Sequence, residues 1–352
     1  SISQKQRAQS LAIAETGVSR VMQFLNSAPI LAKEPLDQWD DKYTELAGLC
    51  GGSSNVVKYS KKDWVTLNNN QGRFRVIDYQ ESSLSLQVEG QSDTNGSNSA
   101  ASIVEVNFAL EPSNVDVPGL FVTEANLTNN EIVGDLLIKG CELGEDVDTD
   151  NVNGKARANA FIEFPDLPQP PGSVTPYDLD EIDSSVTLPD DHDDSTAKDS
   201  DGRYHYLVES IELKGGDTLE VTAGEKVTLY LRGNAEFKGS AKLNHDCDGV
   251  SGCKPTDLQI FGGDGNTGGV YDSETTTVFC LSGNSTADVF LFAPKAKVAV
   301  NGGGSGNGFK GTVWAERWNT GNPSSCGSNA GKVLVTQAAN WNDLPLNAQE
   351  RI

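Results

Sequence analysis

The sequence predicts an α+β protein that is mostly β. We expect an N-terminal helix with a small antiparallel sheet, followed by a β-solenoid in the form of a parallel β-helix. Residues 1–28 carry apolar side chains at helical spacing. Residues 72–110 contain three alternating segments typical of strands. From residue 118 onward, short β-rich segments alternate with glycine turns. Such short strands bury their inner faces by stacking on similar neighbours.

The first element is an amphipathic helix over Ser1–Asn26, whose first turns are polar. One face collects apolar residues three and four positions apart: Leu11, Ala14, Val18, Met22 and Leu25. Together with Glu15, these residues form the predicted assembly face. The pattern indicates a stalk whose far end docks on a domain. The alternative is an ordinary N-terminal helix that packs on a core.

The rest of the chain divides into segments that differ in residue pattern and composition. After the helix (1–28) we expect a small antiparallel sheet (29–117), first solenoid coils (118–163), a linker or excursion rich in Pro and Asp (164–203), and the main solenoid module (204–352). A β-sandwich with many turns is the alternative for the short strands that alternate with glycine turns. A solenoid is favoured because irregular strand spacing is tolerated there through side loops.

The charge and hydropathy of the chain exclude some classes of function. Asp and Glu outnumber Lys and Arg by 50 to 27, for a net charge of −23. Phosphate binding needs clustered basic residues, so nucleic acid is not an expected partner. The sequence contains no apolar run of about 18 residues, the length that spans a membrane. The same charge offers many carboxylates to divalent cations.

Six cysteines predict three disulfides in an oxidising compartment. The sequence does not fix their pairing. Our preferred pairs are Cys247–Cys253, which closes a short loop, and Cys280–Cys326, which closes a long one. Cys50–Cys141 then remains by elimination. Three histidines are too few for a Cys/His zinc cluster with good spacing.

A calcium site is the most credible metal chemistry in the sequence. Asp146, Asp148 and Asp150 alternate, and oxygen ligands at this spacing can surround one Ca²⁺. The segment lacks the glycine and glutamate that an EF-hand needs. A solvated acidic turn is the alternative, and no other cofactor is expected.

We expect no catalytic residues. Arg232 and Glu236 resemble a structural salt bridge rather than a catalytic pair. Trp314, Trp318 and Trp341 are candidates for a sugar-stacking or partner platform. Burial in aromatic stacks is the alternative and the commoner location of such residues. Trp318 lies in a polar segment, so we expect it to be exposed and available for glycan contact.

The N-terminal stretch resembles a known family. Gln6-Arg7-Ala8, Ala12, Ala14-Glu15-Thr16-Gly17 and Arg20 are similar to the start of type IV pilin-like proteins of the minor-pilin (PilX) type. Cyanobacterial hormogonium-polysaccharide surface proteins share this layout. In that family a hydrophobic segment precedes the stretch. The resemblance therefore implies membrane attachment only through an N-terminal segment that is missing from this chain.

A second resemblance covers residues 204–335. VTLYLRGNAEFKG, DLQIFG, ADVFLFAPKAKVAVNGGG and GFKGTVWA resemble an adhesin-like bacterial surface module. The two resemblances imply a non-enzymatic pilin-like protein, outside or on the surface of a bacterium. It would be a subunit or minor component of a type IV pilus-like filament, for adhesion, motility or surface polysaccharide handling. Its partners would be other pilin subunits or itself, and surface polysaccharide. A secreted polysaccharide-active β-helix enzyme, a lyase or hydrolase, is the alternative.

Overall fold

The structure is a computed structural model that describes residues 2–50, 59–60, 62–67, 72–92, 100–109, 116–128, 130–190, 197–266, 268–282, 286–301, 307–320 and 333–346. The chain forms two compact units. One unit comprises Ser1–Glu111 and Ala160–Glu163, and the other comprises Pro112–Asn159 and Phe164–Ile352. The chain therefore enters the second unit, returns briefly to the first, and then completes the second.

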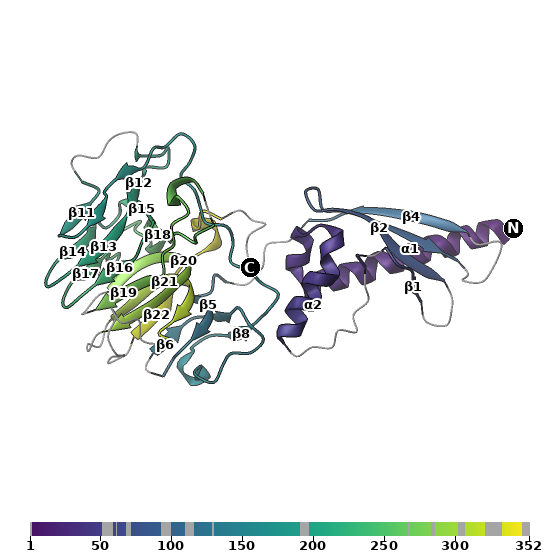
Figure 1. Ribbon diagram of the computed structural model, residues 1–352, viewed down its shortest axis with the longest axis horizontal. Coiled ribbons are helices and arrows are strands. Elements are labelled where there is room, and N and C mark those ends of the chain that lie inside the picture. Colours follow the sequence, from purple (N-terminus) through teal and green to yellow (C-terminus); the bar gives the residue numbers. More distant parts are fainter. Residues whose placement is uncertain are drawn as a thin grey trace. The chain divides into compact units, whose positions relative to one another are not determined.

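The described structure is mostly β, with a long N-terminal helix, a small antiparallel sheet and a large parallel sheet (Figure 1). The prediction of a mostly β, α+β chain that begins with a helix and an antiparallel sheet is confirmed. No described helix is both long enough and apolar enough to cross a membrane.

The first unit combines helices with one antiparallel sheet. Its helices are α1 (Ile2–Ser27), η1 (Pro29–Lys33), η2 (Leu36–Gln38) and α2 (Trp39–Leu49). Its strands are β1 (Val65–Thr66), β2 (Arg73–Gln80), β3 (Ser85–Gln91) and β4 (Ala101–Asn107), hydrogen-bonded in this order. The three predicted strands correspond to β2, β3 and β4. Burial alternates along the whole of β4, whereas the alternation in β2 is interrupted after Val76. The buried side chains of β2 belong to the core of the unit.

Small residues line the face of α1 that packs on the sheet. Ser10, Ala14, Gly17 and Val21 recur every three or four positions, and all four are buried. A Cβ atom at Gly17 would lie 2.7 Å from the ring of Phe74 on β2. The helix backbone itself therefore contacts the sheet, which explains why the face carries small side chains.

The predicted apolar face of this helix is rotated from the buried one. Four of its residues are buried or half-buried: Ala14, Leu25, Val18 and Met22. Leu11, however, is 44% exposed, and Glu15 is exposed. The buried face therefore differs from the predicted assembly face, because apolar periodicity does not detect a contact made by Ser10 and the backbone at Gly17.

The second unit is built from parallel strands. Before residue 160 it contains β5 (Leu120–Ala125), β6 (Asn130–Val133), β7 (Leu136–Ile138), η4 (Thr149–Asn151) and β8 (Ala156–Ala158). After residue 164 its first strands are β9 (Tyr177–Asp178), β10 (Glu181–Ile182), β11 (Val186–Leu188), β12 (Arg203–Val208), β13 (Ser210–Leu213), β14 (Thr218–Val221), β15 (Lys226–Leu231), β16 (Ala235–Phe237) and β17 (Lys242–Asn244). The remaining elements are η6 (Pro255–Asp257), β18 (Leu258–Gly262), η7 (Gly269–Tyr271), β19 (Val278–Ser282), β20 (Thr286–Asn301), β21 (Asn307–Trp318), β22 (Val333–Gln337) and η8 (Trp341–Asp343).

Every ladder between the named strands of this unit is parallel. One path of neighbours within the 15-stranded sheet is β9-β12-β15-β18-β20-β21-β5-β7-β8, and β11-β14-β17 form a three-stranded sheet. Alternate side chains of both sheets enter one apolar core, among them Leu219 and Leu243 of the small sheet and Leu229 and Ile260 of the large one. Figure 1 shows the strands stacked side by side.

The order of strands in space departs from their order in the chain. Strand β5 pairs with β21, with Leu120 opposite Val313, so the early strands stack on the last part of the ladder. Strands β9, β10 and β11 pair instead with β12, β13 and β14. The segment 164–203 predicted as a linker or excursion thus contributes three strands, although residues 191–196 lie outside the described residues.

Candidate functional site

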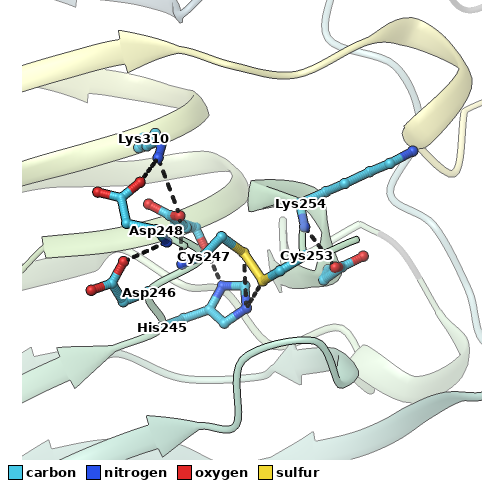
Figure 2. The surroundings of a disulfide bond; sticks show 9 residues. His245, Asp246, Cys247, Asp248, Cys253, Lys254 and Lys310 are labelled. Atoms are coloured by element: carbon cyan, nitrogen blue, oxygen red, sulfur yellow. Dashed lines mark hydrogen bonds and ion pairs between the residues drawn. A yellow bond between two sulfur atoms is a disulfide. The ribbon is translucent and has the colours of Figure 1, made fainter. Parts of the chain in front are cut away.

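The described residues contain one group of three potential metal ligands, which surrounds a disulfide (Figure 2). Cys247 and Cys253 are bonded to each other, six positions apart, so this predicted pair is confirmed. His245 immediately follows β17, and its Nε2 atom lies 3.8 Å from each of the two sulfurs. The ligand atoms of the three residues all lie within 4.8 Å of one another.

Strand β20 fixes the position and the protonation pattern of His245. The backbone carbonyl of His245 accepts a hydrogen bond from the Asp288 N–H at 2.9 Å, and its Nδ1 atom is hydrogen-bonded to the Asp288 carbonyl. A carbonyl oxygen only accepts, so Nδ1 carries the proton. In the neutral ring Nε2 then holds a lone pair, which faces the disulfide. His245 is 0% exposed, so its ring is shielded from bulk solvent.

The carboxyl group of Asp288 anchors the start of the disulfide loop. It accepts a hydrogen bond from the Cys247 N–H at 2.9 Å and lies 3.8 Å from the Lys310 ammonium of β21. Burial raises the pKa of Asp288, although the N–H of Cys247 and the charge of Lys310 oppose the shift. Lys310 also pairs with the exposed Asp248. Neighbouring strands therefore hold one end of the loop.

The far end of the loop is more accessible. Cys247 is 9% exposed and Cys253 is half-buried, while residues 248–252 between them are exposed. The N–H of Lys254 donates to the carboxyl of Asp257 at 2.8 Å, which begins the turn η6. The disulfide can therefore be approached through Cys253, whereas His245 lies behind it.

A second buried polar cluster lies on β12 and β15. His205 Nε2 is 3.0 Å from the Asp199 carboxyl, and His205 Nδ1 is 3.0 Å from the Tyr230 hydroxyl. Burial lowers the pKa of His205, and this effect exceeds the opposing influence of Asp199. In the neutral ring, Nε2–H donates to Asp199 and Nδ1 accepts from Tyr230. Both ring nitrogens are thus engaged, so the cluster ties the segment before β12 to the sheet.

Arg203 strengthens this attachment. Its guanidinium donates to the backbone carbonyls of Val227, Asp257 and Thr256, at 3.1, 2.8 and 3.2 Å. Burial lowers the pKa of Arg203, and the nearby carboxylates of Asp257 and Asp199 counteract that shift. Because the group is fully engaged with backbone acceptors, its geometry indicates a structural role.

The structure does not assemble Asp146, Asp148 and Asp150 into a group that could hold a metal ion. All three are exposed. The Asp148 carboxyl accepts the N–H of Asp150 at 3.0 Å and thereby caps the short helix η4. For Asp148 this local hydrogen bond is a structural role that needs no metal ion.

Trp318 is not the exposed glycan contact that the sequence predicts. It is 0% exposed and ends β21, where its ring packs on Phe309 at a centroid distance of 5.9 Å. The prediction is wrong because its polar sequence neighbours do not show that β20 and β5 flank this strand end. Trp314 is also 0% exposed and lies 6.0 Å from Trp341, centroid to centroid, as expected of a buried aromatic stack.

The other predicted disulfide cysteines are only partly described. Cys50, Cys141 and Cys280 are disulfide-bonded, and Cys326 lies outside the described residues. Disulfides at these positions indicate an oxidising, extracellular environment. Arg232 pairs with Glu209 and Asp272, whereas Glu236 pairs with Lys238, so the predicted pairing of Arg232 with Glu236 is wrong although both residues form salt bridges.

A shallow polar groove of about 490 Å³ lies beside the ends of β6 and β22. Its polar side chains come from four residues: Asp116, Asn153, Gln337 and Asn340. Amide and carboxylate groups of this kind can exchange hydrogen bonds with hydroxyl-rich ligands. The sequence shows no sign of this groove, because its lining residues come from four separate segments.

The sequence contains a signal that could have predicted the group of His245, Cys247 and Cys253. His245 stands two residues before Cys247, and this spacing places both side chains at the same turn. The Asp199–His205–Tyr230 cluster had no comparable signal, because Tyr230 reaches His205 only through the parallel pairing of β12 with β15.

Comparisons with known proteins give one match. A family model described as a domain of unknown function (DUF7305) matches residues 162–329. The matched region includes β9 to β21 and the disulfide group, but not β5 to β8. No curated protein and no solved structure matches the chain.

Proposed function

We propose that this chain is the outward part of a type IV pilin-like cell-surface protein, which is not an enzyme. It serves as a subunit or minor component of a pilus-like filament, in adhesion, motility or surface polysaccharide handling. The observation that carries the proposal is the seating of α1. From Ser10 onward the helix packs on the sheet, whereas residues 4–9 are exposed or half-buried. A helix whose first turns do not pack on the sheet of its own unit suits a stalk.

A stripe beside the docked face is the proposed contact with neighbouring subunits. Leu11, Glu15, Val18 and Met22 follow one another at helical spacing. Leu11 and Glu15 are exposed, and the other two are half-buried. An exposed leucine beside an acidic residue suits a contact that combines apolar packing with charge pairing.

The composition of the chain supports an extracellular location. Disulfide bonds persist in oxidising compartments. A net charge of −23 favours solubility and disfavours binding to nucleic acid. The polar groove at Asp116 and Gln337 supports a role with surface polysaccharide, because sugar hydroxyls suit its amide and carboxylate groups.

The parallel strands of the second unit form, in this proposal, a β-solenoid that is displayed outward. The support is the repeated parallel register, in which β12, β15 and β18 succeed one another in chain order on one ladder. The small sheet β11-β14-β17 repeats the same order. The parallel pairing in both sheets favours this architecture over a β-sandwich, whose sheets are antiparallel.

The test compares two charge substitutions on the helix in cells that produce the full-length protein. Leu11→Asp places a charge in the proposed contact and should reduce surface filaments at least about tenfold, as counted by immunogold electron microscopy. Ala12→Asp places the same charge at an exposed neighbour that points away from the stripe, and filaments should persist.

Equal filament numbers with Leu11→Asp and wild type, at equal surface protein, would contradict the proposal. Removing residues 1–23 is a poorer test, because it deletes Ala14 and Val21 from the core of the first unit. Loss of filaments after that truncation would report unfolding as readily as lost assembly.

A further inference from the structure

We propose that the Cys247–Cys253 disulfide is the oxidised form of a metal site. On reduction, the two cysteine sulfurs and Nε2 of His245 bind one Zn²⁺ ion. The proposal rests on the group of three residues described above and is independent of the role in a filament.

The first support is the lone pair on His245 Nε2. The Asp288 carbonyl engages Nδ1, so the neutral ring offers Nε2 as an acceptor or as a metal ligand. In the oxidised protein its neighbours are two disulfide sulfurs, which carry no proton to donate. A fully buried acceptor without a donor is unfavourable. A histidine held through Nδ1–H by a backbone carbonyl is also the usual second-shell arrangement of a metal ligand.

The second support is the distance between ligand atoms. A tetrahedral zinc ion with ordinary Zn–S and Zn–N bonds separates a sulfur from a nitrogen ligand by about 3.6 Å. The observed separations from Nε2 to both sulfurs are 3.8 Å. Two edges of the coordination tetrahedron are therefore already present. Only the two sulfurs must move apart, to about 3.8 Å.

The loop permits this movement. Gly249 and Gly252 both have positive φ, and a Cβ atom at either would meet nothing within 4 Å. Residues 248–252 are exposed, so the loop is not held by packing. Cys253 is half-buried, which gives a reductant a path to the disulfide.

The chemistry balances with a named reductant. A dithiol or a phosphine supplies two electrons to the S–S bond, which breaks, and two protons give two thiols. The dithiol becomes a disulfide, or the phosphine becomes its oxide with an oxygen atom from water. Zn²⁺ then displaces both thiol protons to the solvent and binds the two thiolates and the imidazole. Two thiolates and one imidazole favour zinc over the hard cations calcium and magnesium.

The test uses the full chain reduced with a phosphine, with Co²⁺ as a spectroscopic probe. The reduced protein should bind one Co²⁺ at this site, with the charge-transfer and d–d bands of tetrahedral thiolate coordination. One equivalent of Zn²⁺ should bleach those bands. The unreduced protein should show no such bands.

Matched variants assign the bands to this group. Cys247→Ser with Cys253→Ser should remove them, while a chain in which Cys50, Cys141, Cys280 and Cys326 are serine should retain them. His245→Gln should weaken Co²⁺ binding by at least about tenfold. Circular dichroism establishes that each variant is folded. Folded, reduced wild-type protein without thiolate bands, or bands that survive the double Cys247/Cys253 substitution, would overturn the proposal.

Discussion

Gly90 of β3 lies directly against the backbone of Ala14 in α1. A Cβ atom at Gly90 would lie 2.3 Å from the Ala14 amide nitrogen and 2.5 Å from the Ser10 carbonyl oxygen. Both obstacles belong to the backbone of the helix, so no side-chain rotation relieves the overlap. The contact fixes how closely the helix sits on the sheet of the first unit.

Gly90→Ala should therefore destabilise the first unit, by about 1–3 kcal/mol, because the helix must move away from the sheet. Urea unfolding followed by the helical circular dichroism signal measures this loss. Gly48→Ala in α2 is the matched control, because a Cβ there meets nothing within 4 Å. It should leave stability unchanged or raise it by up to about 1 kcal/mol. Equal effects of the two substitutions would contradict the close contact.

Trp318 should contribute to stability and not to glycan binding. Trp318→Ala should lower the free energy of unfolding by about 3–5 kcal/mol, because the side chain is fully buried. The indole Nε1 has no hydrogen-bond partner among the described residues. Trp318→Phe removes that unpaired donor and should cost less than about 2 kcal/mol. Chemical unfolding of both variants gives the comparison, and a larger loss for phenylalanine than for alanine would refute it.

His205 should make the stability of the second unit depend on pH. Burial lowers the pKa of His205 below the ordinary value of 6.5. The unfolded chain then binds a proton more readily than the folded chain. The free energy of unfolding should therefore fall as the pH drops below about 6.5, and it should continue to fall towards the lower pKa of the folded state.

Unfolding midpoints at pH 7.5 and pH 5.5 test this dependence. His205→Gln should flatten the difference between the two pH values, since glutamine does not titrate. Asp199, Arg203 and Tyr230 face the imidazole. Hydrogen bonds from His205 and from the N–H groups of Arg203 and Asp201 outweigh burial and lower the pKa of Asp199, so that carboxylate titrates below the tested range. An unchanged pH difference in His205→Gln would contradict the assignment.

The strands of the first unit were predictable because their information is local. The alternation over Arg73–Gln80 and Ser85–Gln91 identifies strands without knowledge of their partners. The pairing of Cys247 with Cys253 was similarly accessible, since the short loop between them brings the two cysteines together. The position of α1 on the sheet was not predictable in this way. Ser10 and Gly17 are buried because they are small, and they add nothing to the apolar pattern of the helix.

The mostly β class, the N-terminal helix and the short disulfide loop can all be predicted from the sequence. These features depend on periodicity and spacing within a few residues. Three other features become visible only in the folded chain: β5 stacks on β21, Trp318 is buried, and His245 Nε2 faces both sulfurs of Cys247–Cys253. Each depends on residues tens or hundreds of positions apart, such as Asp288, whose carbonyl orients the histidine. Their approach is fixed by parallel pairing and packing, which leave no regular pattern along the chain.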